Sequence, residues 1–252
     1  MPARRKFAPR SFEAADIAAG KVEPHYLKVL SRVLAAHAIA EKLTADGYAR
    51  ALTTLTDPAL RTTVEKNLRQ ERKHAALVFG ALAELGISEN LAERQMLPAL
   101  KAPSFEAPRY FAERAAGELD LLMASLSLDT PGLMMIAENY RESSYAPHSR
   151  AAELILEEEA DHDAFAYGQL RAAVERFGKK KVNAALREWI PRAANFFGPP
   201  GSGFTYDCIT YGLKTRDNQE LAELYLEMLA RRVAQAGLEM PRLTPGYPRV
   251  LA

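Results

Sequence analysis

The sequence predicts an all-α protein whose centre is a bundle of four helices. Apolar residues recur every three or four positions along most of the chain, which is the period of an amphipathic helix, and no stretch shows the alternation of a strand. The motif Glu-x-x-His occurs twice, as Glu71 with His74 and as Glu159 with His162. Residues three apart share a helix face, so each pair can direct a carboxylate and an imidazole toward one point. Both motif positions repeat after 88 residues, which predicts two similar helical hairpins.

A carboxylate partner for each motif follows from the same repeat. Glu41 lies 30 residues before Glu71. Asp129 lies at the same distance before Glu159. Glu41 and Glu71 are each 15 residues from position 56, where a turn is predicted, so they face each other across an antiparallel hairpin. At about 1.5 Å per residue, both lie roughly 22 Å from that turn, near the middle of the bundle.

These residues match the ligand set of a known class of metalloprotein. In di-iron and di-manganese four-helix bundles, two helices each supply a Glu-x-x-His pair and two others each supply a carboxylate. The sequence therefore predicts a ferritin-like four-helix bundle with additional C-terminal helices. The predicted metal ligands are Glu41, Glu71, His74, Asp129, Glu159 and His162. Carboxylates and imidazoles suit iron and also admit manganese, so the expected cofactor is a pair of iron ions, with manganese as the alternative.

Three other polar residues are candidates to support the ligands. A metal-binding histidine usually donates its second ring N–H to an acceptor. Gln70 and Glu158 each lie one turn before a motif histidine and are the candidate acceptors. His37 lies one turn before Glu41 and is either a similar support or a core histidine.

Proline and glycine residues mark the four predicted helices. Proline and capping residues favour the first turn of a helix, and glycine favours its end. By this rule the starts are marked by Pro24, by Asp57 with Pro58, and by Pro147, and the ends by Gly86 and Gly178. The third helix, 108–141, contains Pro131, which removes one helical hydrogen bond and predicts a bend beside Asp129. If the bend changes the register, Glu118 and Glu138 on the same helix are the alternative ligands.

The sequence predicts one helical domain, 24–242, with an irregular segment at each end. Its last part carries a helix near 180–197, a break rich in glycine and proline at 198–203, and helical residues from 204 to 237. In order, the predicted segments are an N-terminal arm at 1–23, a first hairpin at 24–86, a crossover at 87–106, a second hairpin at 107–178, C-terminal helices at 179–242 and a tail at 243–252.

Composition disfavours several classes of protein. The 252 residues are 48% apolar and 26% charged, which is typical of a globular protein with one large core. A net charge of +1 gives no sign of a nucleic-acid partner. The single cysteine, Cys208, cannot form an internal disulfide, and no apolar segment follows the basic N-terminus, so a cytoplasmic location is expected. No apolar run approaches the length of a membrane span, and none is expected.

Several short stretches carry a resemblance to a known family. They are Ala36–Glu41 with the first Glu-x-x-His, Ser144–Ala151 leading into Glu158–His162, Trp189–Ala193 with Phe197–Pro199, and Val233–Pro241. Together they resemble the phenylacetic acid catabolic proteins, in particular the catalytic subunit of phenylacetyl-CoA epoxidase, over roughly residues 26 to 242. The resemblance implies the same six ligands, with aspartate on the third helix. Gln70 differs from the family, which has an acid at that position.

The residues and the resemblance predict a non-haem di-iron oxygenase that uses O2 to epoxidise or hydroxylate an aromatic or acyl-CoA-type substrate. The metal motif implies O2 chemistry, and the resemblance implies ring epoxidation. One cysteine cannot hold an iron–sulfur cluster, so a separate reductase is expected as electron donor, within a homo- or hetero-oligomer. The alternatives are a ferritin-like ferroxidase or iron-binding protein, a non-catalytic scaffold subunit of an oxygenase complex, and a di-iron hydroxylase acting on tRNA, which the near-neutral charge disfavours.

Overall fold

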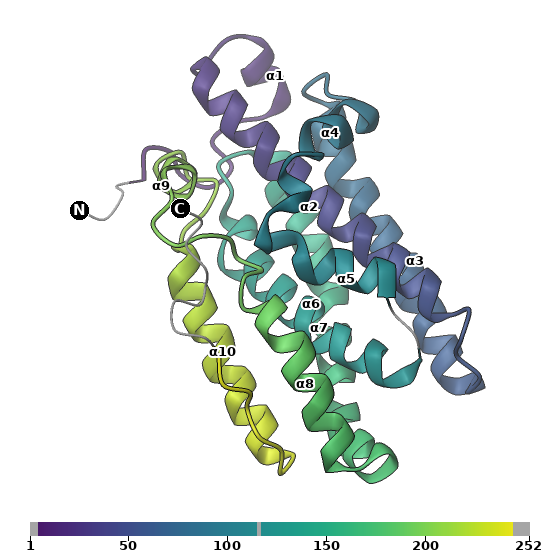
Figure 1. Ribbon diagram of the computed structural model, residues 1–252. Coiled ribbons are helices and arrows are strands. Elements are labelled where there is room, and N and C mark those ends of the chain that lie inside the picture. The colour runs from purple at the N-terminus through teal and green to yellow at the C-terminus, as the bar shows by residue number, and fades with distance from the viewer. Residues whose placement is uncertain (1–4, 115–116, 244–252) are drawn as a thin grey trace.

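The computed structural model describes residues 5–114 and 117–243, and in these ranges it contains ten α-helices, three short 3₁₀ helices and no β-strand (Figure 1). The four long helices of the central bundle are α2 (Pro24–Ala51), α3 (Pro58–Ala83), α6 (Glu118–Glu138) and α7 (Ala146–Phe177). Helix α2 packs against α3, and α6 packs against α7. The two hairpins meet where α3 contacts α7 and α2 contacts α6. The prediction of an all-α four-helix bundle is confirmed.

Local hydrogen bonds define the turn between α2 and α3. The Asp57 carboxylate accepts hydrogen bonds from two backbone N–H groups in the first turn of α3, at 2.9 and 3.0 Å, and Pro58 occupies the first helical position. The Arg61 guanidinium donates to the carbonyl oxygens of Leu52 and Leu55 at 2.6 and 2.9 Å. These contacts satisfy backbone groups that helix ends leave free. They fix where the chain reverses direction. Because α2 and α3 run antiparallel from this turn, positions equally far from it face each other across the hairpin.

The stretch predicted as one helix from 108 to 141 is divided into α5 (Glu106–Arg114) and α6. Gly117 precedes α6 with φ of 101° and ψ of −179°, a backbone conformation that residues other than glycine rarely adopt. Helix α5 packs against α2 and α6 instead of extending α6. Helix α6 continues without a break through Pro131, so Asp129 lies inside a continuous helix.

Helix α6 lies in the centre of the protein. It contacts α7, α5, α8 (Lys179–Ala193) and α10 (Asn218–Gln235), as Figure 1 shows. The Tyr225 hydroxyl on α10 donates a hydrogen bond to the Leu126 carbonyl of α6 at 3.0 Å. By length and composition the stretch Glu118–Glu142 could cross a membrane, but 72% of its most apolar window is buried inside the protein. This central position accounts for its apolar character.

Residues 5–23 of the predicted N-terminal arm pack against the second hairpin and contain α1 (Ala14–Ala18). The backbone N–H groups of Arg10 and Phe12 donate to the carbonyl oxygens of Ser143 and Ser144 at 2.8 and 2.9 Å. These bonds hold the arm beside the turn that leads into α7.

Short helices lie in the crossover and in the segment between α8 and α10. They are α4 (Glu89–Met96), η1 (Ala99–Lys101), η2 (Pro103–Phe105) and, between α8 and α10, α9 (Gly203–Thr210). Helix α9 contacts α2, as does α4. Residues of the crossover and of the α9 region line a cavity beside α2, which is described below.

Candidate metal centre

All six predicted ligand side chains lie together where the two hairpins meet. Each is buried, with at most 8% of its surface exposed. They form two groups in which potential ligand atoms lie within 4.8 Å of one another. The first group is Glu41, Glu71, His74 and Glu159, and the second is Glu71, Asp129 and His162. Glu71 belongs to both groups, so its carboxylate joins them.

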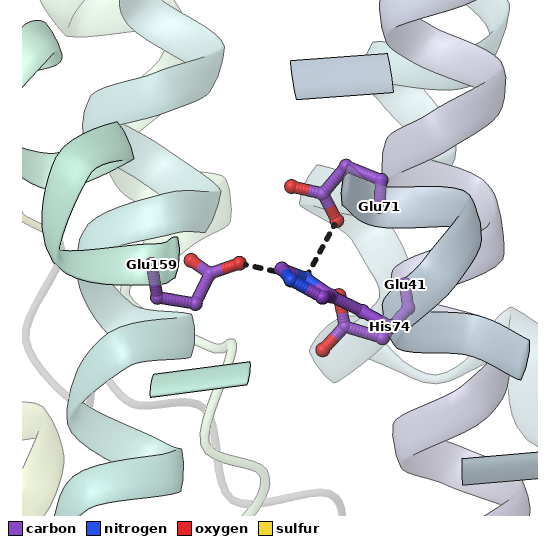
Figure 2. Close-up of side chains that lie close together, drawn as sticks. All are labelled: Glu41, Glu71, His74 and Glu159. Carbon is purple, nitrogen blue, oxygen red and sulfur yellow. Dashed lines mark ion pairs between the residues drawn. The ribbon is translucent and has the colours of Figure 1, made fainter. Parts of the chain in front are cut away.

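Two glutamates, one from each hairpin, lie between the histidines. Glu159 Oε1 is 3.2 Å from His74 Nδ1 and 3.5 Å from His162 Nδ1. The Glu71 carboxylate reaches both rings through its two oxygens, at 3.2 Å from His162 Nδ1 and 4.0 Å from His74 Nδ1. Figure 2 shows Glu159 at the left of the His74 ring and Glu71 above it, with dashed lines from both to the ring and Glu41 beside it. Both carboxylates thus lie within about 4 Å of both histidine rings, and Glu71 is the one that belongs to both groups.

The Nδ1 atoms of both histidines are available for coordination. In the described part of the chain, His74 Nδ1 and His162 Nδ1 are buried and make no hydrogen bond. Buried polar atoms are nearly always hydrogen-bonded, so two such nitrogens that face carboxylates indicate a cation site. Carboxylate oxygens and imidazole nitrogens are donors that fit iron or manganese.

The opposite ring nitrogens are bound by residues of the other hairpin. His74 Nε2 donates to Glu158 Oε2 at 3.0 Å, and His162 Nε2 donates to Gln70 Oε1 at 3.1 Å. Burial would raise the pKa of the Glu158 carboxyl, but hydrogen bonds from Lys73 and His74 hold that pKa below its usual value. Each acceptor thus comes from across the bundle, and it orients the ring with Nδ1 toward the carboxylates.

Burial and mutual repulsion control the charge of the four carboxyl groups. Burial, with the neighbouring charge of Glu159, raises the pKa of Glu71 well above its usual value. Burial also raises the pKa of Asp129 to about 7. For Glu41 and Glu159, burial acts in the opposite direction, but the adjacent histidines outweigh it and lower the pKa. Buried like charges repel one another, so this arrangement is stabilised when cations occupy the site.

Metal binding at this site is expected to release protons and to strengthen as the pH rises. Burial opposes the charged form of His74, but the nearby carboxylates of Glu159 and Glu41 outweigh it and raise its pKa to about 11. The same balance raises the pKa of His162 to about 12. Without metal, the neighbouring carboxylates therefore favour the protonated form of both rings. Coordination requires the neutral ring, so metal binding must displace a proton from each histidine.

Calorimetric titration of the metal-free protein with Mn²⁺, in buffers of different ionisation enthalpy, measures this release. We expect at least two protons per filled site, one from each histidine and further protons from Glu71 and Asp129, whose pKa values burial raises, and an affinity that rises between about pH 6 and pH 8. An affinity that is constant over this range would contradict the assignment of His74 and His162 as ligands.

The structure also brings two residues to the site that the sequence analysis missed. The Tyr48 hydroxyl donates a hydrogen bond to Asp129 Oδ2 at 2.7 Å. His148 Nε2 is 3.1 Å from His37 Nδ1, and His37 Nε2 is 2.9 Å from Glu41 Oε1. Tyr48 lies seven residues after Glu41, a spacing that predicts the same helix face. No sequence spacing marks His148.

The alternative acids on α6 lie elsewhere. Glu118 pairs with Arg176 at 2.6 Å, and Glu138 pairs with Arg216 at 2.7 Å. Asp129 is therefore the α6 acid that lies within reach of the motif residues.

Replacing Tyr48 with phenylalanine is expected to weaken metal binding while the protein stays folded. The change removes the hydrogen bond to Asp129 and keeps the buried ring. Loss of such a bond to a metal ligand typically lowers metal affinity by about 10- to 100-fold. Competition with a chromogenic chelator measures the change. Tyr145→Phe, which removes a buried hydroxyl that donates to the Ala81 carbonyl, is the matched control. Equal affinities for the wild type and Tyr48→Phe would contradict the prediction.

Comparisons with known proteins place the chain in a family. Among solved structures it is similar to Protein 19 with aldehyde deformylating oxidase activity from Synechococcus, with a TM-score of 0.64 and 18% sequence identity over 86% of this chain and 94% of that chain. This likeness shows a shared ferritin-like helical fold. A search of curated protein sequences gave no match. The family model of the phenylacetic acid catabolic proteins matches residues 33–247, and the chain therefore belongs to the phenylacetic acid catabolic protein family.

Proposed function

We propose that this protein is a non-haem di-iron oxygenase. The ions would be held by Glu41, Glu71, His74, Asp129, Glu159 and His162. The observation that carries the proposal is the pair of buried, unbonded Nδ1 atoms of the two histidines, which face the shared Glu71 carboxylate. Manganese suits the same donors and is the alternative metal.

The iron pair, when bound, supplies the O2 activation and oxygen transfer that amino-acid side chains do not provide. The residues of the chain bind and orient the ions. Glu71 and Glu159 lie between the two histidines and would hold the ions there. Glu158 and Gln70 hold the orientation of the imidazole rings. His37 holds Glu41 through a hydrogen bond of 2.9 Å.

A cavity beside the site gives room for an organic substrate. It has a volume of about 280 Å³, and its lining includes Glu41 and His37. Its walls are mainly apolar and include Met135, Ile136 and Phe197. Such walls exclude water and position an apolar molecule next to the metal ligands. This cavity supports oxygenation of an organic molecule over a ferroxidase role.

The proposed substrate is an aromatic or acyl-CoA-type molecule, and the proposed reaction is epoxidation or hydroxylation. Membership of the phenylacetic acid catabolic family supports a small-molecule substrate and assembly with other subunits. Cys208 is the single cysteine of the chain, too few for an iron–sulfur cluster, so electrons would come from a separate reductase.

Incorporation of oxygen from ¹⁸O2 tests the proposal. The iron-loaded protein is incubated with a reductase system and with phenylacetyl-CoA or phenylacetate, and the products are analysed by mass spectrometry. We expect a labelled product that the Glu159→Ala, His162→Ala double variant does not form. Glu65→Gln, an exposed change on α3, is the control and should remain active. Bound iron with O2 consumption but no organic product would favour the ferroxidase alternative.

A further inference from the structure

The cavity beside the metal site has two chemically different ends. At one end its lining includes Glu41 and His37. The lining also includes Arg32, nearer the start of α2, and Lys214, in the loop between α9 and α10. Arg32 and Glu41 are nine residues apart on one helix, so the two ends are separated by about 13 Å along its axis.

Lys214 is a buried cation that forms no ion pair among the described residues, although the charge of Asp217 acts on it. Only 6% of its surface is exposed. Among the described residues, its ammonium makes one hydrogen bond, 3.0 Å to Asn218 Oδ1, and no ion pair. Lysine is rarely this buried unless it is paired, because an isolated ammonium loses its hydration. Burial accordingly lowers the pKa of Lys214.

The loop that carries Lys214 is held in place by hydrogen bonds. The backbone N–H groups of Thr215 and Arg216 both donate to Asn139 Oδ1 at 2.9 Å. The Asn218 amide donates to two other oxygens at 2.9 and 3.1 Å, which orients its Oδ1 toward Lys214. An ammonium has three N–H donors, so two remain for a ligand in the cavity. The cation is therefore preorganised for an acceptor from outside the chain.

Arg32 adds positive charge at the same end of the cavity. Its guanidinium stacks over the Phe204 ring, 4.3 Å from the centroid, and it forms no ion pair in the described part of the chain. Phe204 lies one turn before Cys208 on α9, and the backbone N–H of Lys214 donates a hydrogen bond to the backbone carbonyl of Cys208 at 3.2 Å. Both cations thus lie beside α9. Of the described lining residues, Glu41 at the metal end is the single acid.

We propose that Lys214 binds the carboxylate of a small amphipathic organic acid whose apolar body extends along the cavity toward Glu41. One buried ammonium matches one negative charge, and the walls between the two ends are apolar. A volume of about 280 Å³ suits a small acid. The neutral carbonyl of a thioester would leave the buried ammonium uncompensated. Binding of the acid depends on the cavity alone. Only the later oxygenation of the bound acid rests on the proposed oxygenase function.

The test compares three ligands that share one apolar body. They are 3-phenylpropanoate, its neutral primary amide and its CoA thioester, and binding to the full chain is measured by calorimetry with metal bound and after chelation. We expect the carboxylate to bind more tightly than the amide in both states. Lys214→Met should weaken carboxylate binding by roughly 10- to 100-fold, as expected for a lost charged hydrogen bond, and leave amide binding nearly unchanged. Lys180→Met, at an exposed position on α8, is the matched control.

Thermal unfolding separates recognition from a structural role of Lys214. Methionine keeps the packing of the methylene chain and removes a buried charge, so the melting temperature without ligand should stay the same or rise. A lower melting temperature with equal losses for acid and amide would assign Lys214 to the core and overturn the proposal. Carboxylate binding that disappears on chelation would also overturn it, because the acid would then bind the metal. Thioester binding that is tighter than that of the acid and insensitive to Lys214→Met would do the same.

The two proposals fail in different ways. Carboxylate binding that depends on Lys214, without any oxygenated product, would count against the oxygenase alone. Oxygenation of the thioester without binding of the free acid would count against the role of Lys214 alone.

Discussion

Glu71→Gln is expected to abolish binding of both metal ions, whereas Glu41→Gln is expected to remove only one. The reason is that Glu71 belongs to both ligand groups and Glu41 to one of them. An amide carries no charge to neutralise the cations and is a weaker ligand than a carboxylate. The metal content should fall from about two ions per chain to nearly none in Glu71→Gln and to about one in Glu41→Gln.

Elemental analysis of protein made in iron-rich medium measures this difference. Glu65→Gln, on the exposed side of α3, is the control and should retain the full metal content. The Glu71 variant should still fold, since burial already raises the pKa of Glu71 and disfavours its charge in the metal-free protein. Its melting temperature without metal is expected to equal or exceed that of the wild type. Equal metal losses in the Glu41 and Glu71 variants would contradict a shared Glu71 ligand.

Gly47→Ala is expected to destabilise the protein, although alanine usually favours a helix. A Cβ at Gly47 would lie 2.1 Å from Cδ1 of Phe111, which is too close for both atoms. Phe111 is fully buried and packs against Trp189, with ring centroids 6.3 Å apart, so the ring has no free space to enter. Overpacking of this kind typically costs about 1–3 kcal/mol. At about 2–4 °C per kcal/mol for a chain of this size, the melting temperature should fall by several degrees.

Gly80→Ala on α3 is the matched control for this prediction. A Cβ at Gly80 meets no atom within 4 Å, so the higher helix propensity of alanine should leave stability unchanged or raise it by up to about 1 kcal/mol. Adding Phe111→Leu to Gly47→Ala should recover part of the loss, because the smaller side chain relieves the contact. If Gly47→Ala and Gly80→Ala melted at the same temperature, the close packing of α5 on α2 would not hold.

The sequence by itself determined the elements that depend on local chemistry and on spacing. Proline and capping residues marked the starts of α2, α3 and α7, because these residues act within one helical turn. The repeat of 88 residues and the equal distances from a turn predicted which acids would lie together, since antiparallel helices of constant rise convert sequence distance into position. The six predicted ligand residues lie together in the structure for this reason.

Features that depend on how helices from distant parts of the chain pack were decided only by the tertiary structure. Gly117 separates α5 from α6, and no helical periodicity shows that the chain turns there. Gln70 and Glu158 each accept from the histidine of the opposite hairpin, because the side chains that meet across a bundle depend on its interface and not on one helix. The same holds for Tyr48 beside Asp129.

The cavity shows most clearly a feature that depends on tertiary structure and not on local sequence. Lys214 is one of 33 basic residues in the sequence, and neither its neighbours nor its spacing distinguishes it. It becomes a buried cation because the loop before α10 folds back onto Asn139 at the end of α6. Sequence spacing thus predicted which candidate ligands lie together, because they lie on four regular helices. Lys214 lies in a loop, and the position of a loop residue depends on long-range contacts that a local pattern does not encode.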